Sequence, residues 1–490
     1  MDSGVRMTTT ATGTSPVGSA PAGPTLGTLA YRIVRALARF LLWLFYRRIE
    51  VVGREHIPER GGVIIAANHH NSLVDAMLII ATVPRAVTVL AKAPLFRHPL
   101  IGPPLRLMGA VPVHRRAEAG DDPRRNDEMF ASAIAALRAG RVILIFPEGT
   151  TQPQPILMPL RTGAARLALG AERAMGGASR VTLLPVGLVF HDPGTFRSAS
   201  VQITIGSPVT TADLTAAHRD RPEEAVRAIT ARLTESISAQ IVEAQDQYSL
   251  DLLAVLERAW WQEAARRGEP APPRGEAAES TLAWKQRVMR AGRYLAAREP
   301  HRVAALRRKI EVYRSHLDEV GITSAQLGQP YTPSLVVSYV ATNLLWLALG
   351  LPLACWGIVS HAAPYWLTGQ IVKRLGQTAE EEATDKMAVG LVIYPLLWAI
   401  EGWLVWRLAG RGALLLFVLL IVPSGLMALL WRERLGRFLR QARAFVWFLT
   451  DRGLHRRLLE ERGALVGELR ELADRVPPEV LGADRVKDAR

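Results

Sequence analysis

Between residues 49 and 241 the chain alternates short apolar runs with longer segments whose apolar positions recur every three or four residues. The short runs are typical of buried strands, and the longer segments are typical of amphipathic helices. The predicted strands are Val63–Ala67, Ala86–Ala91, Ala110–Val113, Arg141–Phe146, Val181–Val189 and Val201–Ile205. The predicted helices are Ser72–Ala81, Asn126–Ala139 and Gly163–Ala174, with a closing helix that carries Val226, Ile229, Leu233, Ile237 and Ile241. Strands that alternate with helices predict an α/β catalytic domain with a mainly parallel sheet over residues 49–245.

The segment before this domain divides into two parts. Residues 1–26 are rich in Thr, Ser, Gly, Ala and Pro and lack a long apolar core, which predicts a disordered tail rather than a secretory signal. In residues 27–48, Arg32, Arg35 and Arg39 fall on one stripe of an otherwise apolar helix. This pattern predicts an amphipathic helix on a membrane surface. The alternative is a core helix with a solvated arginine face.

The segment after the domain is helical and then strongly apolar. The helical patterning of residues 246–330 predicts an all-α region, in which we identify no candidate catalytic residues. A Pro/Gly/Glu-rich stretch at 268–279 divides it. Membrane hairpins are predicted for residues 331–431, because their apolar stretches are about as long as, or longer than, the roughly 20 residues that one helical span requires. The candidate stretches are Tyr331–Val372, Met387–Trp406 and Ala413–Trp431, and a short linker at 407–412 joins the last two. Residues 432–490 predict a basic helical tail.

Three simple crossings would place the α/β domain and the basic tail on opposite sides of the membrane, against the positive-inside tendency. Tyr331–Val372 contains Pro352 and Pro364 but no Lys, Arg, Asp or Glu. We therefore expect this stretch to form a proline-broken re-entrant hairpin. The domain and the tail would then both face the cytoplasm, in an integral or monotopic membrane protein.

The charge balance narrows the class of partner. The 490 residues carry a formal net charge of +15, which favours anionic partners: nucleic acid, anionic lipid or phosphorylated substrates. Arginines flank apolar segments rather than alternating with polar or aromatic ones, so membrane lipids are expected and nucleic acid is not. The single cysteine, Cys355, excludes a disulfide within the chain and a cysteine metal cluster.

Candidate chemistry follows the predicted strand Val63–Ala67. His70 and Asp75 lie on either side of the expected start of a helix, where their side chains can meet as a general base and the carboxylate that orients it. One alternative is a helix capped by Asn71 or Ser72, with both histidines satisfied locally. A metal site of His69, His70 and Asp75 is the other, although no further ligand cluster with matching spacing accompanies it.

Two further strand ends carry polar residues. Arg115 follows Ala110–Val113, where it can bind a phosphate through two hydrogen bonds or simply be a surface arginine. Glu148, Gly149 and Thr150 follow Arg141–Phe146. Parallel sheets build their sites at the carboxyl ends of strands, although Pro147 to Gly149 can also be a plain turn.

Taken in order, these motifs resemble the glycerophospholipid acyltransferases, whose signature is His-x4-Asp, Gly-…-Arg, Phe-Pro-Glu-Gly and a late apolar-Pro segment. The matching residues are His70 and Asp75, Gly109 and Arg115, Phe146-Pro147-Glu148-Gly149, and Leu184-Pro185-Val186-Gly187. The resemblance implies a glycerol-3-phosphate or 1-acylglycerol-3-phosphate acyltransferase of phospholipid biosynthesis. It implies that His70 is the base, that Asp75 orients it, and that Arg115, Glu148 and Gly149 help to bind a phosphorylated glycerol.

The chain departs from the commonest pattern at Thr151, where many lysophosphatidate acyltransferases have arginine. The stretches around Arg161 and Arg197, and the long apolar C-terminal region, look more like the fungal-type glycerol-3-phosphate/dihydroxyacetone-phosphate branch. Arg161 and Arg197 are therefore the candidates to replace the missing phosphate contact. The donor is expected to be acyl-CoA or acyl carrier protein, with no cofactor and no metal.

Two other classes of function remain open at this stage. A lipid or thioester hydrolase is the first, but the Gly-x-Ser-x-Gly nucleophile elbow is absent from the sequence. The second is a non-catalytic membrane scaffold or transporter, although Glu401 is the main ionisable residue in the apolar stretches.

Overall fold

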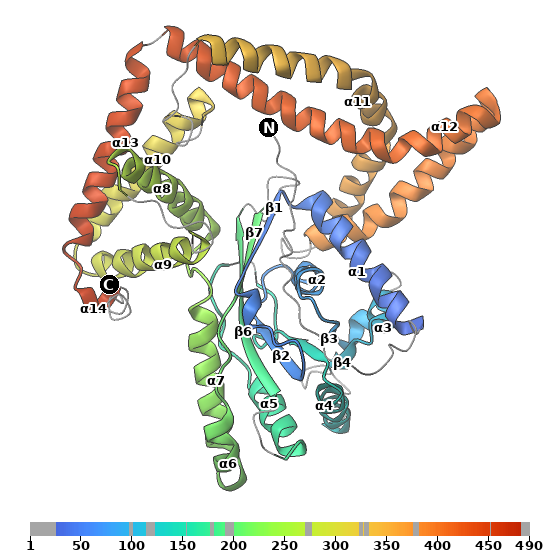
Figure 1. The fold of residues 1–490 in the computed structure, drawn as a ribbon, viewed down its shortest axis with the longest axis vertical. Coiled ribbons are helices and arrows are strands. Elements are labelled where there is room, and N and C mark those ends of the chain that lie inside the picture. Colours follow the sequence, from blue (N-terminus) through green and yellow to red (C-terminus); the bar gives the residue numbers. More distant parts are fainter. Residues whose placement is uncertain are drawn as a thin grey trace, which may run out of the picture.

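The computed structural model describes most of the chain, and Figure 1 shows its arrangement. The described residues are 26–97, 101–113, 123–152, 154–176, 181–191, 200–269, 277–322, 327, 333–375, 382–450 and 452–481. The expected disordered tail at residues 1–26 therefore lies, except for its last residue, outside the described part.

A seven-stranded sheet forms the centre of the first half of the chain, in the order β1-β7-β6-β2-β5-β3-β4. The strands are β1 Arg48–Val52, β2 Gly62–Ala67, β3 Val87–Lys92, β4 Val111–Val113, β5 Val142–Ile145, β6 Val181–His191 and β7 Ser200–Ile205. All neighbours pair in parallel except β6 and β7, which are antiparallel. The predicted α/β class with a mainly parallel sheet is confirmed, whereas β1 was not predicted.

Helices cover both faces of the sheet, which is why its central strands are apolar throughout. One face packs against α1 (Leu26–Phe45), α2 (Leu73–Thr82) and α3 (Gly102–Leu107). The other packs against α4 (Pro123–Arg138), α5 (Gly163–Ala174) and α7 (Pro222–Ser238), with α6 (Ala212–Asp220) beside α7. β2 is buried at every residue, so its carboxyl end opens directly between the two helical layers.

In helix α1, part of the arginine stripe on which both predictions for residues 27–48 depend contacts the α/β domain. Arg35 donates to the carbonyl of Val83 and Arg39 to that of Ala81, both at the C-terminal end of α2. Two of the three arginines therefore bind the α/β domain, where they neutralise the negative end of α2. Large apolar side chains lie on the exposed surface of α1 instead: Leu29, Ile33, Leu37, Phe40 and Trp43.

A helical bundle follows the α/β domain. It contains α8 (Gln247–Arg266), α9 (Ala277–Ala296), α10 (Pro300–Val320), and, from the C-terminal end of the chain, α13 (Arg452–Ala473) and α14 (Pro478–Leu481). Tyr313 and Leu317 of α10 share one apolar core with Leu458 and Val466 of α13. The C-terminal helices therefore return to the bundle that the chain built before it entered the apolar region (Figure 1).

The apolar region consists of α11 (Pro333–Leu375) and α12 (Glu382–Thr450). α12 is two helical limbs, because Gly410 has φ 81° and ψ −174° inside the predicted linker at 407–412. The second limb lies beside α11, with the indole of Trp431 donating to the carbonyl of Leu347 at 2.8 Å (Figure 1).

The expectation of a re-entrant hairpin in Tyr331–Val372 is wrong. α11 is one helix that contains both Pro352 and Pro364. A proline removes one backbone hydrogen bond and kinks a helix, but it does not reverse the chain when neighbouring helices support the segment. That support is close: a Cβ on Gly357 would lie 2.0 Å from the carbonyl oxygen of Ser424 on α12.

Candidate active site

The loop after β2 is anchored to β6 by its first residue, Asn68. Asn68, which is fully buried, donates its side-chain amide to the carbonyl of Leu188 at 2.9 Å and accepts the N–H of the same residue at 2.7 Å. This two-bond link to β6 fixes the direction in which the next residue leaves the sheet. His69 therefore starts from a rigid position at the carboxyl end of a central strand.

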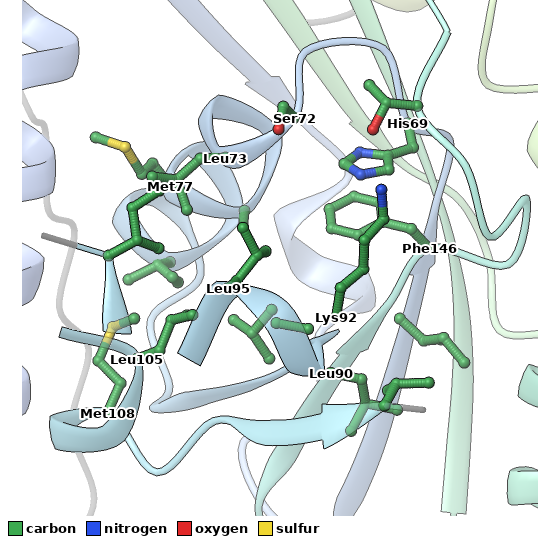
Figure 2. Close-up of a pocket in the computed structure, with 18 of the residues that line it drawn as sticks. His69, Ser72, Leu73, Met77, Leu90, Lys92, Leu95, Leu105, Met108 and Phe146 are labelled. Atoms are coloured by element: carbon green, nitrogen blue, oxygen red, sulfur yellow. The ribbon is translucent and has the colours of Figure 1, made fainter. Parts of the chain in front are cut away.

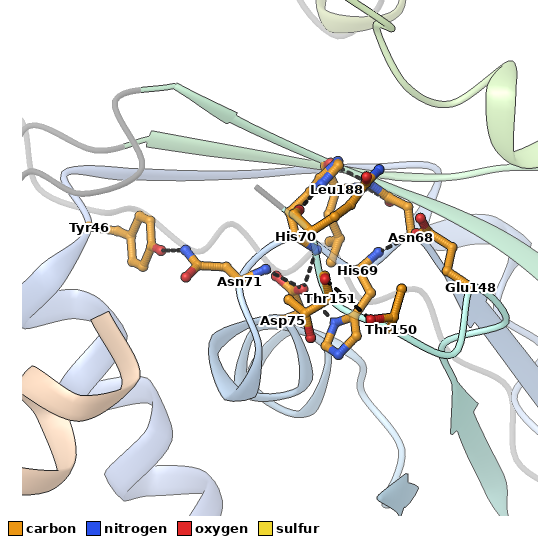
Figure 3. A network of polar contacts seen from close by, with 11 residues as sticks. Tyr46, Asn68, His69, His70, Asn71, Asp75, Glu148, Thr150, Thr151 and Leu188 are labelled. Atoms are coloured by element: carbon orange, nitrogen blue, oxygen red, sulfur yellow. Dashed lines mark hydrogen bonds and ion pairs between the residues drawn. The ribbon is translucent and has the colours of Figure 1, made fainter. Parts of the chain in front are cut away.

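His69, and not His70, forms the imidazole–carboxylate pair. Its Nδ1 lies 2.8 Å from Oδ2 of Asp75, which is fully buried in the first turn of α2 (Figure 3). The same oxygen accepts the backbone N–H groups of His70 and Asn71, each at 2.8 Å. Two amides at a helix N-terminus hold this carboxylate in position, as an orienting acid requires.

The expected pairing of the His70 imidazole with Asp75 is accordingly wrong. The His70 ring turns the other way, and its Nδ1 lies 3.0 Å from the carbonyl oxygen of Gln152. His70 gives Asp75 only its main-chain N–H. The three side chains of the alternative metal site do not converge for the same reason, and the described residues contain no group of three or more His, Cys, Asp or Glu placed to hold a metal ion.

The backbone between the two histidines and α2 explains the shift by one residue. Ser72 has φ 44° and ψ −122°, and the N–H of Val74 donates to the carbonyl of Asn71 at 3.0 Å. This is the geometry of a tight turn whose first central residue favours glycine. The turn takes up the additional residue between His69 and Asp75. Ser72 makes no side-chain cap to α2 either.

The His69 ring is held on its flat side as well as at its edge. It stacks on Phe146 with 4.0 Å between ring centroids and 13° between ring planes. With Nδ1 donating to Asp75, Nε2 is the nitrogen that can accept a proton from a bound molecule. Stacking and the carboxylate together fix the direction of that nitrogen.

Glu148 has a different place from the one predicted for it. The carboxylate is 3% exposed and accepts the N–H of His69 at 2.7 Å and that of Met158 at 3.0 Å. It therefore joins the loop after β5 to the loop after β2 and does not line the cavity beside His69. Burial raises the pKa of Glu148, although both N–H groups act in the opposite direction.

Gly149 and Arg161 are brought together next to Glu148. Gly149 has φ 68°, and a Cβ at this position would lie 2.6 Å from Nε of Arg161. Only glycine lets the arginine cross the loop so closely. Gly149 and Arg161 both line the cavity, whereas Thr150 does not. Arg115 and Arg197 lie outside the described residues.

The cavity in front of His69 has a volume of about 910 Å³. His69, Ser72 and Lys92 gather at one end of the view in Figure 2, whereas apolar side chains of α2 and α3 occupy the other. Arg161 and Arg166 also line the cavity. The site therefore combines an imidazole paired with a carboxylate, three cationic side chains and an apolar chamber.

His69, Lys92 and Arg166 are the site residues that the sequence reasoning did not assign. His69 entered it only as a possible metal ligand. Lys92 is the last residue of β3, so its place at the carboxyl end of a parallel strand was a usable signal. Arg166 lies in the first turn of α5, where the packing of that helix against α4 turns it towards the cavity.

The chain is similar in sequence to known acyltransferases. The family model described as Acyltransferase matches residues 48–189. The chain is 34% identical over 141 residues to a 1-acyl-sn-glycerol-3-phosphate acyltransferase of Borreliella burgdorferi, covering 29% of this chain and 54% of that protein. It is 27% identical over 211 residues to glycerol-3-phosphate O-acyltransferase 2 of Saccharomyces cerevisiae, covering 43% of this chain and 27% of that protein.

A third relative is matched along most of its own length. The 1-acyl-sn-glycerol-3-phosphate acyltransferase of Bacillus subtilis is 27% identical over 201 residues, which is 41% of this chain and 89% of that protein. The chain thus spans about half of the Borreliella protein and about a quarter of the yeast protein. The matched segment is the α/β domain that carries His69, and the predicted resemblance is confirmed at the level of the family.

Proposed function

Because residues 48–189 belong to the glycerophospholipid acyltransferase family, we propose that this chain transfers a fatty acyl group to a phosphorylated glycerol. The donor is an acyl thioester, acyl-CoA or acyl carrier protein. The acceptor is glycerol-3-phosphate or 1-acylglycerol-3-phosphate. The observation that carries the proposal is the His69–Asp75 pair at the cationic end of a large apolar cavity.

The reaction follows from the position of the His69 ring. Nε2 of His69 removes the proton from the acceptor hydroxyl, and the oxygen attacks the thioester carbonyl carbon. The carbon–sulfur bond then breaks, and the departing sulfur takes the proton from His69. Asp75 keeps the imidazole in the tautomer that begins this cycle and stabilises the imidazolium that forms within it. One ester-type bond replaces another, so the scheme needs no cofactor and no metal.

The charged side chains divide the substrate between the two ends of the cavity. Arg161, held across Gly149, binds the acceptor phosphate, and Lys92 adds positive charge next to His69. Leu73, Ala76, Met77 and Ile80 present one continuous face of α2 to the cavity. This face, about 10 Å long at 1.5 Å per residue, holds the acyl chain.

The apolar helices support a membrane location. Val336–Arg374 and Asp385–Trp447 are long and apolar enough to cross a membrane, judged by length and composition. α10 before them and α13 after them pack in one bundle, and His316 bonds Glu461 between these helices at 2.9 Å. Both ends of the apolar segment therefore meet in one bundle, so α11 and the two limbs of α12 do not each cross the membrane once, and we place this bundle, with the α/β domain, in the cytoplasm.

An acylation panel with the purified full-length protein tests this function. Glycerol-3-phosphate, dihydroxyacetone phosphate and 1-acylglycerol-3-phosphate are each offered with palmitoyl-CoA or palmitoyl acyl carrier protein, and products are followed by mass spectrometry. We expect one acylated acceptor for each thiol released. Free fatty acid formed at the same rate with and without an acceptor would identify a hydrolase and reject the proposal.

A further inference from the structure

One wall of the active-site cavity comes from a part of the chain that lies far outside the acyltransferase match. Met387, Ala388 and Leu391, near the start of α12, line the cavity together with residues of α1 and α2. In Figure 1 the first limb of α12 begins beside these two helices. The helix that runs into the apolar region therefore also bounds the space in front of His69.

The contribution of α12 is apolar and partly buried. Met387 packs against the core cluster formed by α1, α2 and the sheet. Leu391 is 45% exposed and Leu37 of α1 is 36% exposed, although both also line the cavity. Residues that face both the chamber and the outside mark its rim. Met387 and Ala388 therefore bound the chamber beside a rim formed by α1 and α12.

The position of this wall is fixed from behind by α11. A Cβ on Gly390 would meet Thr368 of α11 at 4.0 Å, an ordinary packing contact, and Thr368 is 8% exposed. His361 of α11 stacks edge-on against Trp398, two turns further along α12, with 5.4 Å between ring centroids. The helix pair that supplies the membrane segment thus also holds the wall in place.

We propose that Met387–Leu391 forms the wall that limits the length of the acyl chain. This inference rests on the proposed acyl transfer, with the carbonyl carbon at His69 and the chain lying along α2. The apolar helices would then do more than anchor the enzyme: their packing against each other sets the depth of the chamber. A residue that narrows the chamber at α12 should discriminate against long chains and leave short ones unaffected.

The test places bulk at Ala388, with a matched control that does not line the cavity. Ala388→Phe fills the chamber from α12, whereas Val392→Phe adds a similar ring at an exposed position four residues later. Purified wild type and both variants are given an equimolar mixture of lauroyl-, myristoyl-, palmitoyl- and stearoyl-CoA. Because each added methylene in a full apolar pocket costs about tenfold or more in specificity, the stearoyl-to-lauroyl ratio of kcat/KM should fall at least tenfold in Ala388→Phe. It should stay unchanged in Val392→Phe.

Three outcomes separate this inference from the proposed function. An unchanged ratio in Ala388→Phe, or an equal loss for every donor, overturns the role of α12 and leaves acyl transfer in place. If wild type acylates no acceptor, the proposed function fails. Photolabelling then tests independently whether residues 387–391 lie against a bound acyl chain. Palmitoyl-CoA with a terminal diazirine should then label residues 387–391, and labelling confined to α2 and α3 would overturn the inference.

Discussion

The α/β domain and the helical bundle each bury a glutamate, and the two carboxylates are held in opposite ways. In the domain, Glu148 is 3% exposed and accepts the main-chain N–H groups of His69 and Met158. In the bundle, Glu263 is fully buried and is surrounded by the guanidinium groups of Arg266, Arg267 and Arg462.

The difference shows what each region is built to hold. Glu148 joins two loops at the carboxyl ends of strands through amides alone, which leaves the cationic side chains of the site facing a cavity. Glu263 instead uses its charge to join α8 to α13, and with them the residues before the membrane segment to those after it. In the α/β domain the buried carboxylate positions the loop that carries His69. In the bundle it links a helix before the membrane segment to a helix after it.

The largest predicted effect separates the two neighbouring histidines. His69→Ala removes the ring that is paired with Asp75, so acyl transfer should fall by about 10²–10⁴-fold, the usual contribution of a general base. His70→Ala removes one hydrogen bond to the carbonyl of Gln152 and should cost about fivefold at most, which corresponds to about 1 kcal/mol. Initial rates with palmitoyl-CoA measure both variants, and circular dichroism checks that both are folded. Equal losses would reject His69 as the base.

The sequence specified the fold of this region better than its chemistry. β2 was predicted because its residues are an unbroken apolar run, and a fully buried strand has that pattern. β1 was missed because its five residues include Arg48 and Glu50, which are tolerated at the edge of the sheet. The choice between His69 and His70 depended on the turn at Ser72, whose positive φ no spacing rule encodes.

For residues 246–490 the sequence predicted helices, but it did not predict how these helices pack against each other. A short linker was predicted at 407–412, and the break at Gly410 lies within it. The return of α13 to α10 was not predicted, because long-range packing between amphipathic helices leaves only a general apolar stripe in each sequence. The wall that α12 adds to the cavity follows from that same packing and has no local signature.

Removing the charge of Glu263 should produce the largest loss of stability in the bundle. Glu263→Gln removes the buried charge that lies against Arg266, Arg267 and Arg462, and loss of the charged partner in a buried ion pair costs about 3 kcal/mol. Glu311→Gln is the matched control, since its pair with Arg307 is exposed and worth about 0.5 kcal/mol or less. Urea titrations in detergent compare the variants. A loss in Glu311→Gln as large as that in Glu263→Gln would argue that the bundle does not depend on its buried charge.

The two glutamates should also respond to pH with opposite signs. Hydrogen bonds from Arg266 and Arg267 hold the pKa of Glu263 below its ordinary 4.5, so its stabilisation is present above that value and is lost as the pH falls through the lowered pKa. Burial raises the pKa of Glu148 above 4.5, so protection of its loops is greatest below 4.5 and declines as the pH rises through the raised pKa.

Hydrogen exchange followed by mass spectrometry can resolve these two effects, because it reports each region separately. After correction for the intrinsic rate of amide exchange at each pH, opening of α8 and α13 should increase towards acid, and opening of residues 146–158 should increase away from it. Glu263→Gln should flatten the first dependence and Glu148→Gln the second. If exchange changed with pH in the same direction in both regions, the difference between amide and guanidinium partners would not determine the charge of Glu148 and Glu263.

The smallest effect concerns backbone strain, which the two regions also treat differently. In the described part of the bundle and the apolar helices, the residues with positive φ are the glycines Gly268, Gly321 and Gly410. The α/β domain places Ser72 at φ 44° beside the His69 ring, at a cost of order 1 kcal/mol for a residue with a Cβ. Ser72→Gly relieves this strain, partly offset by the entropy of glycine, and should raise the thermal midpoint by about 1–3 °C. Ser72→Ala also removes the hydroxyl but keeps the Cβ, so it should not raise the midpoint. If both variants lower the midpoint equally, the hydroxyl of Ser72 contributes to stability and the strain of its backbone does not. The turn between His69 and Asp75 would then be held by side-chain contacts.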